Sequence, residues 1–132
     1  ELLPVKDTPF DFNERKRIGQ DLEADHPQLK NAFGYDHSFV LNGKENQLTL
    51  EEPVSGRRLI ISTTAPVVQV YTGNFLKDGC IGKVGRVYEN REGVALETQL
   101  MPNAINTEEN PSTILRKGEK FDSTTRYVFE IM

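Results

Sequence analysis

The stretch Val94-Ala95-Leu96-Glu97-Thr98-Gln99-Leu100 decides the fold, because it alternates between apolar and polar side chains. Successive side chains of a β-strand point to opposite faces, so a period of two is typical of a half-buried strand. The apolar members share one face: Val94, Leu96 and Leu100. Glu97 falls on the other face, with Ala95 and Gln99. The strand therefore turns a carboxylate away from its apolar side.

The same alternation recurs along much of the chain. It predicts further strands over these segments: Gln47–Glu51, Arg57–Thr64, Val67–Thr72, Val84–Tyr88 and Thr124–Ile131. The segment Asn90-Arg91-Glu92-Gly93 is typical of a hairpin connection leading into the strand that holds Glu97. We therefore expect an all-β fold, a β-sandwich of about seven or eight strands.

One segment alone favours a helix. Asn13 is a suitable N-cap for Glu14–Leu22, but Gly19 weakens the interior, so a short helical turn at most is expected. Two long connections, residues 6–33 and 102–118, carry no strand pattern. Loops of this length in a compact β domain are usually functional or wrapped over the surface. His26, within the first connection, is expected to be exposed.

Size and charge exclude several classes of protein. The 132 residues fit a single domain, 1–132, and 16 basic residues against 20 acidic ones give a net charge of −4. Nucleic acid is an unsuitable partner, because phosphate binding needs a clustered basic face. No apolar run approaches the roughly 18 residues of a membrane span. The single cysteine, Cys80, has no base near it in sequence and excludes an intramolecular disulfide. We expect a cytoplasmic protein without a membrane partner.

A second predicted strand carries two side chains, Gln69 and Tyr71, that could line a binding surface together with Glu97. In Val67-Val68-Gln69-Val70-Tyr71, Gln69 and Tyr71 share a face. If the polar faces of the two strands align in one sheet, a carboxylate, an amide and an aromatic ring line one concave surface. Such a surface suits a sugar, whose hydroxyls take hydrogen bonds and whose C–H face packs on a ring. The simpler alternative is that all three side chains are solvated.

Three motifs occur in the order found in aldose 1-epimerases, the galactose mutarotase family. They are Gly34-Tyr35-Asp36-His37, then Gln69-Val70-Tyr71-Thr72-Gly73-Asn74-Phe75, then Leu96-Glu97-Thr98-Gln99 followed by Pro102-Asn103-Ala104-Ile105-Asn106. The chain also resembles the family at Thr8-Pro9-Phe10-Asp11-Phe12, at Pro111-Ser112 and at Lys117-Gly118-Glu119. The resemblance is to the C-terminal part of the family and covers nearly the whole chain. It implies an antiparallel β-sandwich of the large galactose-mutarotase (supersandwich) type.

The resemblance also implies a reaction, the interconversion of α and β anomers of galactose or glucose. A base removes the proton of the C1 hydroxyl while an acid protonates the ring oxygen, and both groups must reach within about 3 Å. By similarity Glu97 is the catalytic base. The resemblance implies that Asp36 accepts from a sugar hydroxyl as a charged group, and that Gln69 contacts the sugar or helps to orient Glu97. Together with Tyr71, which shares its strand face with Gln69, they are the expected substrate-binding residues. The reaction needs no metal and no organic cofactor.

Asp36 and His37 each have a simpler interpretation. An Asp after Gly34-Tyr35 can merely form a turn. His37 titrates near neutral pH and is a tempting acid, but in an extended segment it points opposite to Asp36, so we interpret it as structural.

The sequence departs from the family in one respect. Family members are considerably longer, and their acid histidine, a second substrate-contacting histidine and an arginine come from the N-terminal half. No residues of this chain match those motifs, so we expect that half, in the same or another chain, as a partner. The absent acid leaves open a non-catalytic carbohydrate-binding module. A relative acting on phosphorylated sugars would need basic residues near the cleft, where the sequence offers Arg86, Arg91 and Arg126.

Overall fold

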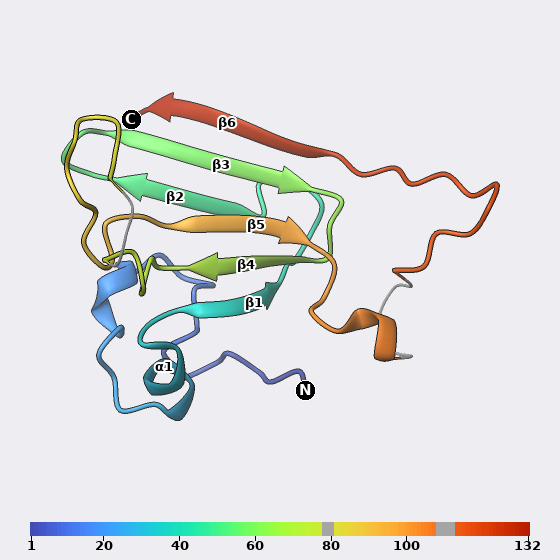
Figure 1. The fold of residues 1–132 in the computed structure, drawn as a ribbon, viewed down its shortest axis with the longest axis horizontal. Coiled ribbons are helices and arrows are strands. Elements are labelled where there is room, and N and C mark those ends of the chain that lie inside the picture. The colour runs from blue at the N-terminus through green and yellow to red at the C-terminus, as the bar shows by residue number, and fades with distance from the viewer. Residues whose placement is uncertain (78–80, 108–112) are drawn as a thin grey trace. The chain divides into compact units, whose positions relative to one another are not determined.

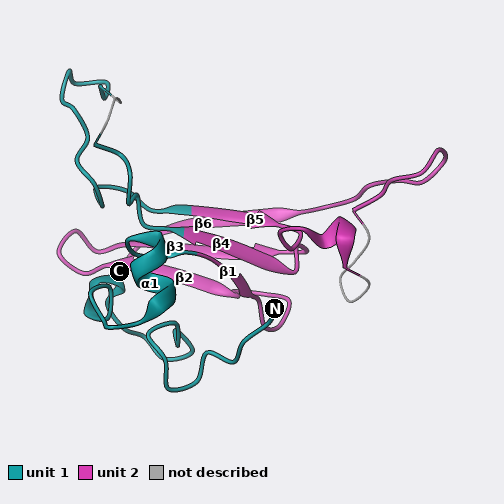
Figure 2. Cartoon of the chain, turned by 60° about the horizontal axis from the view of Figure 1, so that its bottom comes forward, with its two compact units in different colours: residues 1–36, 71–95 teal, residues 37–70, 96–132 magenta. Residues whose placement is uncertain are grey.

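A computed structural model describes residues 1–77, 81–107 and 113–132 (Figure 1). Strands dominate it. In chain order the elements are η1 (Ile18–Gln20), α1 (Pro27–Ala32), β1 (Asp36–Val40), β2 (Leu48–Glu52), β3 (Arg57–Thr63), β4 (Val67–Tyr71), β5 (Ala95–Gln99), η2 (Ala104–Asn106) and β6 (Thr125–Ile131). The chain divides into two compact units (Figure 2). Unit 1 comprises Glu1–Asp36 and Tyr71–Ala95, and unit 2 comprises His37–Val70 and Leu96–Met132.

Unit 2 is built from two three-stranded sheets. Their strand orders are β1-β4-β5 and β2-β3-β6, and in Figure 1 neighbouring strands of each sheet run in opposite directions. β3 lies at the centre of the second sheet and pairs antiparallel with both neighbours, with Leu59 opposite Leu50 on β2 and opposite Phe129 on β6. Antiparallel strands with period-two alternation can bury one face against a second sheet, which gives the sandwich.

Three threonine hydroxyls identify the inner face of the β2-β3-β6 sheet. Thr125 of β6 bonds Thr63 of β3, directly opposite it, at 2.8 Å between the two Oγ1 atoms. The same Thr125 Oγ1 lies 3.0 Å from Oγ1 of Thr98 on β5, in the other sheet. Thr63, Thr125 and Thr98 therefore face the interior, and every second residue from them along each strand shares that face.

The core of unit 2 gathers at one end of this sandwich. Ile61 is 1% exposed, and Val67 and Val68 of β4 are likewise buried. Thr63, two residues beyond Ile61 on the same face, is buried too. The packed region therefore surrounds the end of β3 that lies next to the start of β4.

Unit 1 is organised around the buried ring of Tyr35. Its hydroxyl donates to the carbonyl oxygen of Pro9 at 2.7 Å, and its backbone N–H donates to Thr72 Oγ1 at 3.1 Å. The rings of Phe10 and Phe12 meet it edge-on, with centroids 5.5 and 5.4 Å away. Edge-to-face aromatic contacts add to the burial energy, so these rings form a small closed core.

Position 34, directly before Tyr35, requires glycine because of its backbone conformation and its close neighbours. Its φ is +141°, and a Cβ at this position would lie 2.4 Å from Asn74 Oδ1. The Asn74 amide donates to the carbonyl oxygens of Ala32 and Tyr35, at 2.7 and 3.0 Å. A side chain at residue 34 would therefore displace the group that satisfies two backbone carbonyls.

Residues 6–33 contain a second helical segment, α1, which the sequence analysis did not predict. α1 forms there, with Pro27 in its first turn and His26 as its N-cap, whose Nδ1 accepts from the Gln28 N–H at 3.3 Å. His26 is half-buried rather than exposed, because its ring also packs against Phe10 at 5.1 Å between centroids. The segment Glu14–Leu22 forms only the 3₁₀ turn η1, which confirms the expected short turn.

The predicted strand Val84–Tyr88 is also wrong. The described residues there form a single isolated bridge, Ile81 to Val87, so no hairpin leads into β5. Val84 is 88% exposed, so the apolar side chain that the alternation assigned to a buried face lies in water. Six strands form in the described residues, fewer than the expected seven or eight. Cys80 and Pro111-Ser112 lie outside the described residues.

Candidate functional site

Glu97 occupies the middle of β5 and is exposed. Its neighbour Thr98 faces the interior of the sandwich, where it bonds Thr125. Because side chains alternate along a strand, Glu97 points out of the sandwich on the opposite side of the sheet. This is the orientation that the alternation of the sequence predicts, and it leaves the carboxylate accessible to a ligand.

Gln69 lies on β4, the strand next to β5 in the same sheet. The hydroxyl of Ser38 on β1 donates to Gln69 Oε1 in a short hydrogen bond. This bond holds the Gln69 side chain against β1. Gln69 and Glu97 thus come from adjacent strands of unit 2. Ser38 was not singled out from the sequence, although it stands two residues after Asp36 and alternation along β1 gives both the same face.

Asp36 and Tyr71 belong to unit 1. Asp36 is the exposed first residue of β1, and Tyr71 is the half-buried last residue of β4. The Tyr71 hydroxyl accepts a hydrogen bond from the N–H of Phe75 at 3.0 Å. This bond ties the ring to the Gly73-Asn74 turn, so Tyr71 is held by its own motif. His37, the second residue of β1, is half-buried.

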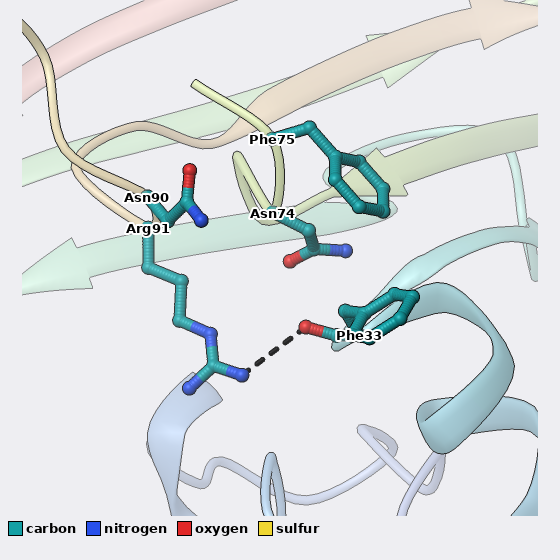
Figure 3. A pocket seen from close by; sticks show the side chains of 5 residues that line it. All are labelled: Phe33, Asn74, Phe75, Asn90 and Arg91. Carbon is teal, nitrogen blue, oxygen red and sulfur yellow. Dashed lines mark hydrogen bonds between the residues drawn. The ribbon is translucent and has the colours of Figure 1, made fainter. Parts of the chain in front are cut away.

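A shallow pocket in unit 1 is lined by Phe33, Asn74, Phe75, Asn90 and Arg91 (Figure 3). The rings of Phe33 and Phe75 are both exposed and meet edge-on at 5.5 Å. Arg91 donates to the Phe33 carbonyl oxygen at 3.1 Å and pairs with Glu23. The Asn90 side-chain oxygen accepts from the Lys77 N–H at 2.9 Å. These polar groups are thus used within unit 1, which indicates that they brace its loops.

Two of the three arginines that could bind a phosphorylated sugar are engaged with carboxylates. Arg86 bonds Glu92 at 2.7 Å, and Arg91 pairs with Glu23. The Arg86 hydrogen bond lowers the pKa of Glu92, and the Glu89 N–H, which donates to the same carboxylate, adds to the effect. This arrangement does not favour phosphate binding.

Elsewhere in unit 1, burial raises the pKa of Tyr35 to about 12, with a smaller effect from the negative charge of Asp21. Its phenol therefore acts as a fixed hydrogen-bond donor to Pro9.

Within the described residues, no group of three or more His, Cys, Asp or Glu side chains is placed to hold a metal ion. The same part of the chain contains no helix that is long and apolar enough to cross a membrane.

Comparison with known proteins identifies the family. The family model described as aldose 1-epimerase matches residues 1–128. Galactose mutarotase from Sus scrofa is 40% identical, with 99% of this chain and 38% of that protein covered. Aldose 1-epimerase from Escherichia coli (strain K12) is 37% identical, with 97% and 38% covered. This chain thus spans somewhat over a third of the length of the curated relatives that it matches.

Solved structures agree with the sequence comparison. The GalM/aldose epimerase homologue from C. elegans superposes with a TM-score of 0.82 at 30% identity, over 96% of this chain and 38% of that one. Galactose 1-epimerase from Lactobacillus acidophilus NCFM gives 0.71 at 29% identity, over 98% and 37%. The predicted antiparallel β-sandwich of the galactose-mutarotase type is confirmed. The chain belongs to the aldose 1-epimerase family.

Proposed function

We propose that this chain supplies the base side of a hexose mutarotase, which interconverts the α and β anomers of galactose or glucose. The observation that carries the proposal is the position of Glu97. It stands exposed at the centre of β5 and points out of the sandwich, within the Leu96-Glu97-Thr98-Gln99 motif of a family member. A general base needs a carboxylate that a substrate can reach, and Glu97 meets that requirement.

The chemistry requires one base and one acid. The Glu97 carboxylate takes the proton of the C1 hydroxyl, the bond between C1 and the ring oxygen breaks, and an acid protonates that oxygen. The open aldehyde turns about the C1–C2 bond and closes with the opposite configuration, and each group reverses its role. Proton transfer by a positioned side chain contributes about 10²–10⁴-fold to such a reaction. No step calls on a metal or an organic cofactor.

Three further residues are proposed to hold the sugar. Asp36 accepts from a ring hydroxyl, since a charged acceptor makes a shorter and stronger hydrogen bond than a neutral one. Gln69, held by Ser38, donates through its amide nitrogen. Tyr71, braced by Phe75, offers its ring to the C–H face of the pyranose. The engaged arginines favour a neutral hexose over a phosphorylated one.

The acid is proposed to come from the part of the family fold that this chain does not match. The chain contains two histidines. His26 caps α1 through Nδ1 and packs on Phe10, and His37 is half-buried in β1. Neither is proposed as the acid, so we expect that the chain alone does not accelerate mutarotation.

The test uses a chimera in which this chain replaces the matched region of the Sus scrofa galactose mutarotase. Polarimetry starting from pure α-galactose measures the approach to anomeric equilibrium. We expect the chimera to accelerate it and Glu97→Gln to lower that rate by about 10²-fold or more, because the amide cannot take a proton. Glu45→Gln is the matched control, since Glu45 is an exposed glutamate of the loop before β2.

Two outcomes would contradict the proposal. If the Glu97→Gln chimera interconverts the anomers at the unsubstituted rate, Glu97 is not the base. If the unsubstituted chimera folds and binds galactose but leaves mutarotation unaccelerated, the chain is a carbohydrate-binding module of mutarotase fold.

A further inference from the structure

Ser38 and Gln69 face each other where β1 pairs with β4. The N–H of Leu41, just after β1, donates to the carbonyl oxygen of Pro66, just before β4, at 3.0 Å. The two strands are neighbours and run in opposite directions (Figure 1), so three residues inward from this bond Ser38 stands opposite Gln69. An odd step from a hydrogen-bonded pair leads to a non-hydrogen-bonded pair, whose side chains lie closer together. The backbone of unit 2 therefore brings these two side chains within reach of each other.

The hydrogen bond between them restricts the glutamine. Ser38 Oγ and Gln69 Oε1 are 2.5 Å apart, and both residues are half-buried. Glutamine is one of the side chains that lose most rotamer freedom when they are fixed, whereas serine has a single side-chain torsion between heavy atoms. The hydroxyl thus holds the amide before any ligand arrives. A group that is held in advance loses less conformational entropy when it binds.

We propose that Ser38 is a positioning residue, which holds the Gln69 amide ready to bind a hydroxyl of the hexose. This inference rests on the proposed function, because it takes Gln69 as a substrate-binding residue. Ser38 acts through Gln69 and does not itself touch the sugar. Its hydroxyl can both donate and accept, so it can hold the amide by either end. Loss of this hydroxyl should weaken binding of the sugar and leave proton transfer by Glu97 unchanged.

The test uses two variants of the chimera with the Sus scrofa protein that differ only in the hydroxyl. Ser38→Thr keeps it, Ser38→Val has a methyl group in its place, and both β-branched residues suit a strand. NMR titration of each chimera with galactose measures the dissociation constant, Kd. We expect Ser38→Thr to stay within about 2-fold of the unsubstituted chimera. Ser38→Val should raise Kd by about 3- to 10-fold, which is the usual net effect of one hydrogen bond.

Kinetics and melting temperatures accompany the titration. In polarimetry, Ser38→Val should raise KM by a similar factor and leave kcat unchanged, as expected when only binding is lost. Melting temperatures show whether the variants fold. If Ser38→Val does not fold, Ser38→Ala takes its place, since it removes the hydroxyl without adding a methyl group.

A double-mutant cycle distinguishes positioning from a direct contact with the sugar. Introduced together with Gln69→Ala, Ser38→Val should have no further effect on Kd, because the side chain that Ser38 positions is already gone. Ser62→Ala is the matched control. Ser62 is a half-buried serine of β3 whose Oγ accepts from the Asn46 N–H at 2.9 Å. Its loss should leave Kd unchanged with and without Gln69→Ala.

Three results would overturn the inference. Equal Kd values for Ser38→Thr and Ser38→Val would make the hydroxyl irrelevant to binding, whatever the melting temperatures of the two variants. An equal rise in Kd with and without Gln69→Ala would mean that Ser38 does not act through Gln69. A chimera that folds but does not bind galactose would remove the role of Gln69 and the enzyme together.

Polarimetry separates this inference from the proposed function. If Ser38→Val raises Kd only when Gln69 is present, but the unsubstituted chimera leaves mutarotation unaccelerated, the positioning role stands and the enzyme does not. If the chimera accelerates mutarotation and the Thr and Val substitutions give the same KM, the enzyme stands and the positioning role does not.

Discussion

Ile61 and Ile131 are the same residue type on the same face of the same sheet, yet one is 1% exposed and the other 76%. Ile61 lies in the closed end of the sandwich, next to the threonine hydroxyls that join the two sheets. Ile131 lies at the other end of that face, which we call the open end because the side chains of Phe129 and Ile131 are mostly in water there. Ile61 belongs to the central strand of this sheet and Ile131 to its outer strand, so the two positions differ in how many neighbours surround them. The comparison shows that burial along this face falls from the Thr125 end of β6 to the Ile131 end.

Unit 1 contains a second well-packed core, around Tyr35. The ring of Tyr35 is fully buried, and its hydroxyl and backbone N–H both have hydrogen-bond partners within the unit. The motif Gly34-Tyr35-Asp36-His37 is therefore anchored by its aromatic residue. Tyr35 directly precedes Asp36, so the same segment contributes to the stability of unit 1 and carries the proposed substrate contact.

The largest loss of stability is expected from a substitution at the closed end, where Ile61 lies. Ile61→Ala removes a fully buried side chain and leaves a cavity, so the free energy of unfolding should fall by about 2–5 kcal/mol. Urea denaturation followed by far-UV circular dichroism measures it. A loss below about 1 kcal/mol would mean that this end is not packed as described.

An intermediate effect is expected at alkaline pH in unit 1. The pKa of Tyr35 is raised to about 12 in the folded chain, from 10.0 in the unfolded one, so the folded state keeps its proton longer. Its contribution to stability is complete below pH 10 and is lost as the pH rises through 12, at about 1.4 kcal/mol per pH unit at most. Urea denaturation at several pH values measures this slope. Tyr35→Phe cannot titrate and should lack it, and an identical slope in that variant would assign the loss to other groups.

The smallest effect is expected at the open end. Ile131→Ala in the chain alone should change the free energy of unfolding by no more than about 0.5 kcal/mol, because the side chain is mostly in water already. The same denaturation experiment measures it beside Ile61→Ala. If the two isoleucines cost the same, the distinction between a closed and an open end is lost.

Local alternation predicted much of the sheet structure. β2, β3, β4, β5 and β6 form within about two residues of their expected limits, and Glu97 takes the predicted side of β5. Alternation failed at Val84–Tyr88 because a strand also needs a partner, and pairing depends on residues distant in sequence. α1 was missed because six residues are too few for a helical period, although Pro27 in its first turn is a recognised start signal.

The proposed site could be predicted only in part, for a related reason. Alternation along a strand predicts the face of the sheet on which each side chain lies, but it does not predict which residue forms a hydrogen bond with that side chain. Ser38 orients Gln69, and the N–H of Phe75 holds Tyr71. Both bonds depend on the folded backbone, so neither is visible in residue spacing. The roles of Asp36, Gln69, Tyr71 and Glu97 came from the order of motifs, because a solvated glutamate and a catalytic one have the same alternation.

Chemical rescue tests the role of Glu97 most directly. Exchange NMR on ¹³C1-labelled galactose measures the interconversion of its anomers by the chimera carrying Glu97→Ala, without and with added formate. If Glu97 is the base, the variant should lose accelerated exchange, and formate should restore part of it by entering the vacated space as a small carboxylate. Formate should leave the unsubstituted chimera unchanged. Full exchange in Glu97→Ala without formate would contradict the assignment of Glu97 as the base.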